Sequence, residues 1–268
     1  MNSLLIGCGN LGEEILRGLL KKKKKIFVLE KNKKILNQLR KKYSKTTFFE
    51  KIDSIDWNKI DYLMICIKPK HSKKLLQEIR NIYKNHHIII SFVAGLETKI
   101  IENNVFKKCK VVRLMPNIFI SSNNSATAIF TKNINRNVKI EILKEFQHFG
   151  ESIIVNDEKK FNFFTAMFGG GPAYLFFILE CFNKLIIKQG FNKKESSLLL
   201  SSLLLGVTRL LQSGNINFDK LIEKVASKGG TTEEALKVFR KNSVLFKIIK
   251  EAINKATKKS NKISKLLN

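Results

Sequence analysis

The sequence predicts an α/β fold in which a mostly parallel sheet is covered by helices and is followed by an all-helical second part. Three observations predict it. Up to about residue 155, short apolar runs rich in β-branched residues alternate with helix-length segments. A G-x-G-x-x-G motif follows the first of these runs, and beyond residue 157 the strand signals stop. We therefore place a domain boundary between residues 156 and 157, giving domains 1–156 and 157–268.

The strands of the first domain are predicted from eight apolar runs. In chain order they are SLLIG, KIFVLE, TTFFE, DYLMICIK, HIIISFV, KVVRLM, ATAIFT and ESIIV. Helix-length segments such as NLGEEILRGLL at 10–20 and PKHSKKLLQEIRNIY at 69–83 lie between several of them. Pro69 stands at a plausible first helical position. Strand, helix and strand at this spacing indicate parallel crossovers.

The second domain reads as a series of helices with capping and terminating residues. A long helix is predicted from Pro172 to Gly190, and Asn192 can cap the next one, which Gly214 ends. Thr231 followed by Glu234 has the spacing of a capping box, so another helix is predicted to begin there. Several of these helices are apolar around much of their circumference, which predicts burial against another subunit in a homodimer or a higher homo-oligomer.

The charge of the chain is strongly basic, with a formal net charge of +28. Only seven of the 50 basic residues are arginine, and the bias toward lysine, Asn, Ile and Phe is better explained by an A/T-rich genome than by phosphate recognition. No basic stretch is interleaved with stacking aromatics, so we expect no nucleic-acid partner. The four cysteines lack zinc spacing, which predicts no metal site. Lacking a signal-peptide pattern or a run of 18 apolar residues, the chain is expected to have no membrane partner and to lie in the cytoplasm.

The glycine motif predicts a Rossmann-like dinucleotide-binding domain. Gly7 suits the tight turn, Gly9 the close approach of a pyrophosphate and Gly12 the packing of helix against strand. Asn10 and Leu11 complete the cofactor-binding turn. At the end of the second strand, Glu30 can bind the ribose hydroxyls of NAD, whereas Lys31 can meet the 2′-phosphate of NADP. This spacing leaves the choice between NADPH and NADH open.

Other candidate cofactor residues follow later strands. Ile67, Lys68 and Pro69 lie after the fourth strand, at the edge where open α/β sheets bind ligands. Asn117 ends another strand at the same edge, although a plain turn residue after Pro116 is an equal interpretation. We expect the backbone at 67–69 to line the nicotinamide side of the site.

Two glycines precede the helix predicted at Thr231. Gly229 and Gly230 have no Cβ, so a ligand can come close to backbone N–H groups that the helix dipole biases toward anions. On these residues alone an ordinary loop and N-cap is the simpler interpretation.

Six motifs, in this order and spacing, resemble the pyrroline-5-carboxylate reductase family. They are GCGNLG at 7–12, CIKP at 66–69, SFVAG at 91–95, RLMPN at 113–117, GGGPAY at 169–174 and VASKGGTTEEAL at 225–236. The resemblance implies reduction of 1-pyrroline-5-carboxylate to L-proline by NAD(P)H, with NADPH favoured, and a second domain for substrate binding and dimerisation. The chain departs from the family at Phe168 and Gly170, where serines are usual.

The resemblance also implies roles for the loop before the late helix. It implies that the substrate carboxylate is held by Gly229, Gly230 and Thr231, with the hydroxyl of Ser227 contributing, and that Thr232 hydrogen-bonds the ring nitrogen in the catalytic step. Two alternatives remain: a different imine or 2-hydroxyacid reductase, and a basic nucleic-acid-binding protein. The hydroxyacid alternative needs a catalytic lysine in the helical half, where no lysine stands in a recognisable motif.

Overall fold

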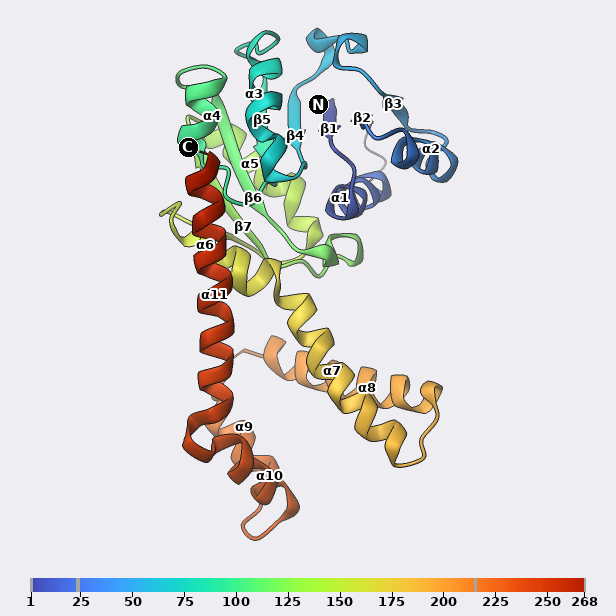
Figure 1. The fold of residues 1–268 in the computed structure, drawn as a ribbon, viewed down its shortest axis with the longest axis vertical. Helices are drawn as coiled ribbons and strands as arrows, with labels where there is room; N and C mark the ends of the chain where they lie inside the picture. The colour runs from blue at the N-terminus through green and yellow to red at the C-terminus, as the bar shows by residue number, and fades with distance from the viewer. Residues whose placement is uncertain (1, 23–24, 215, 268) are drawn as a thin grey trace. The chain divides into compact units, whose positions relative to one another are not determined.

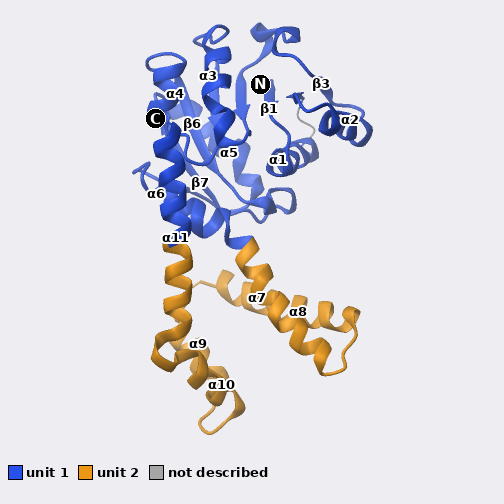
Figure 2. Ribbon diagram, in the orientation of Figure 1, with its two compact units in different colours: residues 1–172, 255–268 blue, residues 173–254 orange. Residues whose placement is uncertain are grey.

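The computed structural model of the protein describes residues 2–22, 25–214 and 216–267 (Figure 1). The chain forms two compact units, coloured separately in Figure 2. The first comprises residues 1–172 together with 255–268, and the second comprises residues 173–254. The first unit thus extends past residue 156 and takes in the C-terminal stretch, because residues from both stretches enter its core.

A single eight-stranded sheet forms the centre of the first unit. Its strands are β1 (Ser3–Ile6), β2 (Ile26–Leu29), β3 (Thr47–Phe49), β4 (Tyr62–Ile65), β5 (Ile88–Ser91), β6 (Lys110–Met115), β7 (Thr127–Lys132) and β8 (Ser152–Ile154). The order across the sheet is β3-β2-β1-β4-β5-β6-β7-β8. The first six strands run parallel, β7 is antiparallel to β6, and β8 is parallel to β7. This confirms the eight predicted strands and the Rossmann-like order of the first six.

Helices cover both faces of this sheet. The α-helices of the first unit up to β8 and just beyond it are α1 (Asn10–Lys21), α2 (Lys33–Lys42), α3 (Ser72–Arg80), α4 (Thr98–Asn104), α5 (Arg136–Phe146) and α6 (Lys160–Phe164). Short 3₁₀ turns occur at η1 (Ile52–Ser54), η2 (Trp57–Lys59), η3 (Pro69–His71), η4 (Ile118–Ser122) and η5 (Gln147–Phe149). A π-turn, η6 (Thr165–Gly169), follows α6. Pro69 opens η3, as predicted for a first helical position.

Alternate strand residues enter two separate cores, one on each face. Leu5 and Met64 pack in a cluster with residues of α1 and α5. Leu4 and Leu63, their neighbours in sequence, pack in a second cluster with residues of α3 and α4. Both faces of the sheet are therefore buried, which explains why the central strands are continuous apolar runs in the sequence.

The segment after β8 belongs to the first unit because its aromatic residues complete a third cluster. Phe161 and Phe164 pack with Met115 of β6 and Val155. Beside them, the buried Arg113 donates to Glu158 at 2.8 Å and lies 4.5 Å from the Phe161 ring centroid. An arginine inside a strand is thus neutralised in the core, which is a structural role.

The C-terminal stretch is fixed to the same unit by a buried polar contact. Asn162 Oδ1 accepts hydrogen bonds from Ser260 Oγ at 2.7 Å and from Ser264 Oγ at 3.4 Å. All three side chains are buried. Gly95 lies against the same stretch, since a Cβ built there would be 2.9 Å from the Ser264 nitrogen. These contacts explain why residues 255–268 are part of the first unit.

The second unit is entirely helical. The remaining helices of the chain are α7 (Gly171–Lys188), α8 (Lys193–Gln212), α9 (Phe218–Val225), α10 (Thr231–Arg240), the 3₁₀ turn η7 (Lys241–Ser243) and α11 (Val244–Leu267). Asn192 caps α8 through a complete capping box with Glu195, as its position predicted. Ser196 Oγ donates to Asn183 Oδ1 at 2.6 Å and joins α8 to α7.

Large apolar side chains are exposed along the helices of the second unit. Those more than half exposed include Leu175, Phe176, Phe177, Leu185, Leu198, Leu199, Leu203, Phe218, Val225, Val238, Phe246 and Ile248. This apolar surface exceeds what a monomer normally leaves in water, which agrees with the prediction that another subunit covers it.

One helical stretch, Lys160–Lys188, is long and apolar enough to cross a membrane by length and composition alone. It has 29 residues, with a mean hydropathy of 1.3 in its most apolar 18-residue window. Asn162, Glu180 and Asn183 interrupt its apolar residues, so the stretch contains no unbroken apolar run of 18 residues. Core helices of non-membrane proteins pass the same test, so this finding alone decides nothing.

The prediction that Thr231 and Glu234 form a capping box is wrong. Gly230 is the N-cap residue of α10, with extended backbone, and no side chain caps the helix there. Thr231 is instead the first helical residue, and the carboxylate that reaches back is that of Glu233, which accepts from the Gly229 N–H at 2.6 Å. The helix begins where predicted. Its N-cap residue is Gly230 and not Thr231, so the glutamate that contacts the backbone before the helix is Glu233 and not Glu234.

We predict that Asn162→Ala lowers the free energy of unfolding by about 1–3 kcal/mol, because the hydroxyls of Ser260 and Ser264 lose their buried acceptor. Urea unfolding followed by the fluorescence of the only tryptophan, Trp57, measures this directly. The control is Asn103→Ala on the exposed side of α4, expected within about 0.5 kcal/mol of wild type. Equal effects of the two substitutions would contradict the anchoring role.

Candidate functional site

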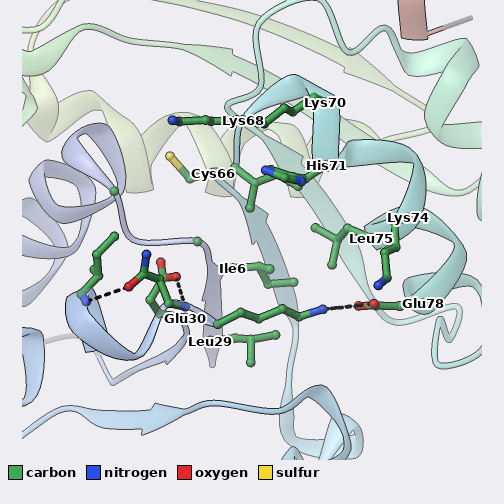
Figure 3. A pocket seen from close by; sticks show the side chains of 16 residues that line it. Ile6, Leu29, Glu30, Cys66, Lys68, Lys70, His71, Lys74, Leu75 and Glu78 are labelled. Atoms are coloured by element: carbon green, nitrogen blue, oxygen red, sulfur yellow. Dashed lines mark hydrogen bonds and ion pairs between the residues drawn. The ribbon is translucent and has the colours of Figure 1, made fainter. Parts of the chain in front are cut away.

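A pocket of about 520 Å³ lies at the carboxyl ends of β1, β2 and β4 (Figure 3). Its lining residues are Ile6, Gly7, Gly9, Leu29, Glu30, Lys31, Asn32, Ile35, Cys66, Ile67, Lys68, Lys70, His71, Lys74, Leu75 and Glu78. The strand order brings the residues after β2 and β4 to either side of the turn after β1. This is the edge at which open parallel sheets bind ligands.

The three glycines of the motif meet three different requirements. Gly7 has φ +86°, and a Cβ there would lie 2.5 Å from Ile67 Cγ2 and 2.6 Å from the Cys66 carbonyl oxygen. A Cβ on Gly12 would lie 2.6 Å from the Gly7 carbonyl oxygen. At Gly9 a Cβ would meet nothing within 4 Å, so this backbone faces open space. Gly7 and Gly12 are therefore required by the protein itself, whereas Gly9 leaves room for a ligand.

The helix that follows the turn presents its N-terminus to the pocket. α1 begins at Asn10 with Gly9 as its N-cap residue, and no side chain caps it. Backbone N–H groups of the first turn carry the positive end of the helix dipole. Together with the open backbone at Gly9, this arrangement suits a pyrophosphate.

Glu30 ties the glycine turn to the end of β2. Its carboxylate accepts from the Cys8 N–H through Oε2 and from the Asn32 N–H through Oε1, both at 2.8 Å. Only 8% of the residue is exposed. The acid predicted to bind ribose hydroxyls thus holds two backbone groups of the protein itself, and each carboxylate oxygen keeps a lone pair that a ribose hydroxyl could use.

Lys31 lies beside it in the pocket and forms an ion pair that Figure 3 marks with a dashed line. Its ammonium group is 3.0 Å from Oε1 and 2.9 Å from Oε2 of Glu78, a residue of α3. Four further basic side chains line the pocket: Lys68 just before η3, Lys70 and His71 from η3, and Lys74 from α3. Lys68 was predicted from the sequence, and the other three were not. Lys70 and His71 lie four and three residues before Lys74, which places them on one helical face and is the signal that could have identified them.

The two thiols next to the pocket are not ready nucleophiles. Burial raises the pKa of the Cys66 thiol to about 12. Burial also raises the pKa of Cys8, with Cys66 and Glu30 adding to the shift. Both thiols stay protonated at neutral pH, so neither cysteine is suited to act as a nucleophile or as a general base in this site.

Not every predicted cofactor residue lines the pocket. Gly7, Gly9, Glu30, Lys31, Ile67 and Lys68 do, whereas Asn10, Leu11, Gly12, Pro69 and Asn117 do not. The Asn117 amide is already engaged at both ends. Its Oδ1 accepts from the Phe119 N–H at 3.0 Å and its Nδ2 donates to the Phe168 carbonyl at 3.3 Å. The amide keeps one N–H group and one oxygen lone pair beyond these two bonds.

Asn117 instead connects the end of β6 to the π-turn. Its backbone N–H donates to Ser125 Oγ at 3.0 Å, and its amide reaches Phe168 within the turn Thr165–Gly169. The Phe168 ring lies 4.7 Å from that of Phe164. Phe168 and Gly170, which stand where the family usually has serines, therefore lie in and directly after the π-turn. The Phe168 carbonyl is bound by Asn117, and the Phe168 ring packs on Phe164.

The second predicted site is the turn before α10. Gly229 has φ +74°, and the Gly230 N–H donates to the Ser227 carbonyl at 3.0 Å. A Cβ on Gly230 would lie 2.7 Å from Ser227 Oγ. The structure thus brings Ser227, Gly229, Gly230 and Thr231 into one turn, with Thr232 half-buried in the first helical turn. The Glu233 carboxylate on the Gly229 N–H shows that an anionic oxygen fits this backbone.

Among residues 2–22, 25–214 and 216–267, no group of three or more His, Cys, Asp or Glu side chains could hold a metal ion. The two candidate sites lie in different compact units, the pocket in the first and the turn before α10 in the second.

Comparison with known proteins matches different family models to the two parts of the chain. The family model described as NADP oxidoreductase, coenzyme F420-dependent, matches residues 4–95, and the one described as pyrroline-5-carboxylate reductase dimerisation matches residues 158–263. The pyrroline-5-carboxylate reductase of Aquifex aeolicus is 30% identical over 205 residues, 76% of this chain and 75% of that protein. That of Staphylococcus haemolyticus is 27% identical, over 99% of this chain and 98% of that protein.

Solved structures share the fold over nearly the whole chain. The pyrroline carboxylate reductase of Plasmodium falciparum with NADP bound has a TM-score of 0.88 at 22% identity, over 98% of both chains. A pyrroline-5-carboxylate reductase from Coxiella burnetii has a TM-score of 0.84 at 26% identity, also over 98% of both chains. The identity to the Aquifex protein over three quarters of both chains, joined to the glycine turn and the helical unit, shows that this chain belongs to the pyrroline-5-carboxylate reductase family.

Proposed function

We propose that this protein reduces 1-pyrroline-5-carboxylate to L-proline with a reduced nicotinamide dinucleotide, the last step of proline synthesis. The observation that carries the proposal is the glycine turn after β1, with its open backbone at Gly9, in a chain of this family. A dinucleotide fits the residues present: Gly7 and Gly12 leave room only for backbone, and the uncapped α1 faces the pocket. The bound cofactor supplies hydride to the imine carbon.

The protein's own contribution is orientation and the placing of hydrogen-bond donors. The substrate is a cyclic imine that carries a carboxylate, and its nitrogen must bear a proton for the carbon to accept hydride. No acid–base pair is needed in such a site, because positioning and preorganised donors supply the rate enhancement. This agrees with the raised pKa of Cys66, which leaves that thiol protonated.

In this proposal the turn before α10 holds the substrate. The N–H groups of Gly229, Gly230 and Thr231, with the Ser227 hydroxyl, receive the substrate carboxylate, which replaces the Glu233 carboxylate on Gly229. Thr232, one residue into α10, offers its hydroxyl to the ring nitrogen. A hydroxyl is too weak an acid to be the only proton source, so solvent or an already protonated imine supplies the proton.

We propose NADPH as the preferred reductant, with NADH also accepted. Lys31, Lys70, His71 and Lys74 line one pocket, where basic side chains favour a 2′-phosphate. The family model that matches residues 4–95 describes NADP oxidoreductases, and the structurally similar Plasmodium protein has NADP bound. The preference is measured from the rates with each cofactor at matched concentration.

We propose that the working enzyme is a homodimer or a higher homo-oligomer in the cytoplasm, with no nucleic-acid or membrane partner. The apolar side chains exposed on α7 and α8 give the helical unit a surface that needs a partner, and the unit lies within residues 158–263, which match the dimerisation family. A second copy covering the stretch Lys160–Lys188 also accounts for its apolar composition.

One assay tests the proposal against its alternatives. Purified protein is mixed with NADPH and 1-pyrroline-5-carboxylate, and loss of the reduced cofactor is followed with formation of proline. A different imine or 2-hydroxyacid reductase would oxidise NADPH only with another substrate. A nucleic-acid-binding protein would show no turnover and a binding constant for nucleic acid that falls steeply with salt.

Glu30→Gln is predicted to weaken binding of NADPH and NADH by a similar factor, about five- to tenfold. The amide keeps only one acceptor oxygen for the two N–H groups of Cys8 and Asn32, so one hydrogen bond is lost and the glycine turn is less ordered in the free protein. Ordering the turn when either cofactor binds then costs about 1–1.5 kcal/mol. Fluorescence titration with each cofactor measures the two constants. If only NADH binding weakened, Glu30 would act on the ribose and not on the turn.

Thr232→Ala is predicted to lower turnover about tenfold or more while NADPH binding stays nearly intact. The reason is that one preorganised hydrogen bond to the reacting nitrogen is lost, in a different unit from the glycine turn. Steady-state rates and NADPH titration separate the two effects. Thr232→Ser keeps a hydroxyl and should recover most of the rate, and an alanine variant within twofold of wild type would remove Thr232 from the mechanism.

If each active site takes its cofactor from one subunit and its substrate turn from the other, two inactive variants should complement each other. Gly9→Asp blocks the pyrophosphate by size and charge, and Thr232→Ala removes the hydroxyl. In a mixed dimer one site then carries both defects and the other none, so activity rises to a substantial fraction of wild type. Differentially tagged mixed dimers with no activity above either parent would show that both parts come from one chain.

A further inference from the structure

The ion pair between Lys31 and Glu78 joins two walls of the dinucleotide pocket. Lys31 comes from the turn after β2, and Glu78 comes from α3. Both carboxylate oxygens contact the ammonium group, at 3.0 and 2.9 Å. The Glu78 side chain is 24% exposed and that of Lys31 is 56% exposed, so the carboxylate is the more buried of the two charges.

Glu78 is out of place in a pocket that otherwise carries positive charge. Lys31, Lys68, Lys70, His71 and Lys74 line the same space. The other acidic residue there is Glu30, and its oxygens already accept from backbone N–H groups. Within residues 2–22, 25–214 and 216–267, the Glu78 carboxylate accepts only from the ammonium group of Lys31, beside the glycine turn, and from no backbone N–H group. Its charge therefore acts directly on whatever anion enters.

NADPH and NADH differ at the adenosine ribose, where NADPH carries a 2′-phosphate of nearly two negative charges at neutral pH. A carboxylate that neutralises Lys31 removes one attractive charge from that phosphate and places a repulsive one a few ångströms away. The uncharged 2′-hydroxyl of NADH is affected far less by either change. The ion pair therefore acts selectively on NADPH.

We propose that Glu78 is a specificity-determining residue that limits the preference for NADPH over NADH by neutralising Lys31. This inference rests on the proposed nicotinamide-dependent function. Lys70, Lys74 and His71 still favour the 2′-phosphate, so Glu78 reduces the preference without reversing it. NADH then remains a usable reductant, because the Glu78 carboxylate does not repel the uncharged 2′-hydroxyl of its ribose.

The test compares four versions of the full chain: wild type, Glu78→Gln, Lys31→Met and the double variant. Dissociation constants are measured for NADPH and NADH, and for the fragments 2′,5′-ADP and 5′-AMP, which differ only in the 2′-phosphate. Thermal unfolding checks that each variant is folded. Because these are binding measurements, they need neither the substrate nor turnover.

Charge neutralisation predicts a definite order of NADPH affinity. Glu78→Gln leaves Lys31 unpaired and should bind NADPH about five- to tenfold more tightly than wild type. Lys31→Met leaves the bare carboxylate and should bind it more weakly than wild type by a similar factor. The double variant should fall between the two single variants, and the NADH constants should move by no more than about twofold. The fragment pair should repeat the pattern, and raising the salt concentration should compress it.

A matched control removes an equivalent carboxylate outside the pocket. Glu102 of α4 pairs with Lys132 at 2.8 Å and does not line the pocket, so Glu102→Gln makes the same charge change elsewhere on the unit. It should shift the ratio of NADH to NADPH dissociation constants by less than twofold. A shift as large as that of Glu78→Gln would mean that only net charge matters, and would overturn the proposal.

Glu78 could instead orient Lys31 for the phosphate, and that outcome has its own signature. Wild type would then bind NADPH more tightly than all three variants, which overturns the proposal. If the protein binds both cofactors and Glu78→Gln leaves the ratio of their dissociation constants unchanged, this inference alone is overturned. A wild-type chain that binds neither cofactor overturns the proposed function, and this inference with it.

Discussion

The space around the turn after β1 is the constraint on which the rest of the first unit depends. Gly7 packs against the backbone of Cys66 with no room for a Cβ, and Gly12 packs against Gly7 in the same way. The Gly7 N–H also donates to the Leu29 carbonyl at 2.9 Å. β1, β2, β4 and α1 therefore meet at a point where only main chain fits. A larger residue at either glycine would separate the strands whose ends form the pocket.

Much of the fold could be predicted because local signals and tertiary environment agree. Runs such as LLI at 4–6 and III at 88–90 are apolar throughout because both faces of the sheet are covered, and such runs are visible without knowing their neighbours. Asn192 was identifiable as a cap because its partner, Glu195, is three residues away. The fold depends mainly on short-range patterns of this kind.

The parts that could not be predicted depend on long-range contacts. Nothing near Glu78 in the sequence indicates that it meets Lys31, 47 residues away. Asn117 was predicted as either a cofactor residue or a turn residue, and no local pattern indicates that its amide contacts Phe168, 51 residues on. At α10 the capping-box pattern gave a wrong prediction. Gly230, one residue before Thr231, is the N-cap residue, because a glycine can take this position without a capping side chain. Local patterns identified the kind of residue at the site, while packing decided which partner each one has.

The polar anchor of Asn162 to Ser260 and Ser264 has a consequence for how the chain is made. The first unit is closed by residues from both ends of the sequence, with the 82 residues of 173–254 between them. Synthesis runs from the N-terminus, so the sheet leaves the ribosome well before the stretch that completes its core. Until residues 255–267 emerge, the Asn162 amide and the surface around Gly95 lack their partner. The nascent sheet must therefore persist with this surface uncovered until the stretch 255–267 has been made.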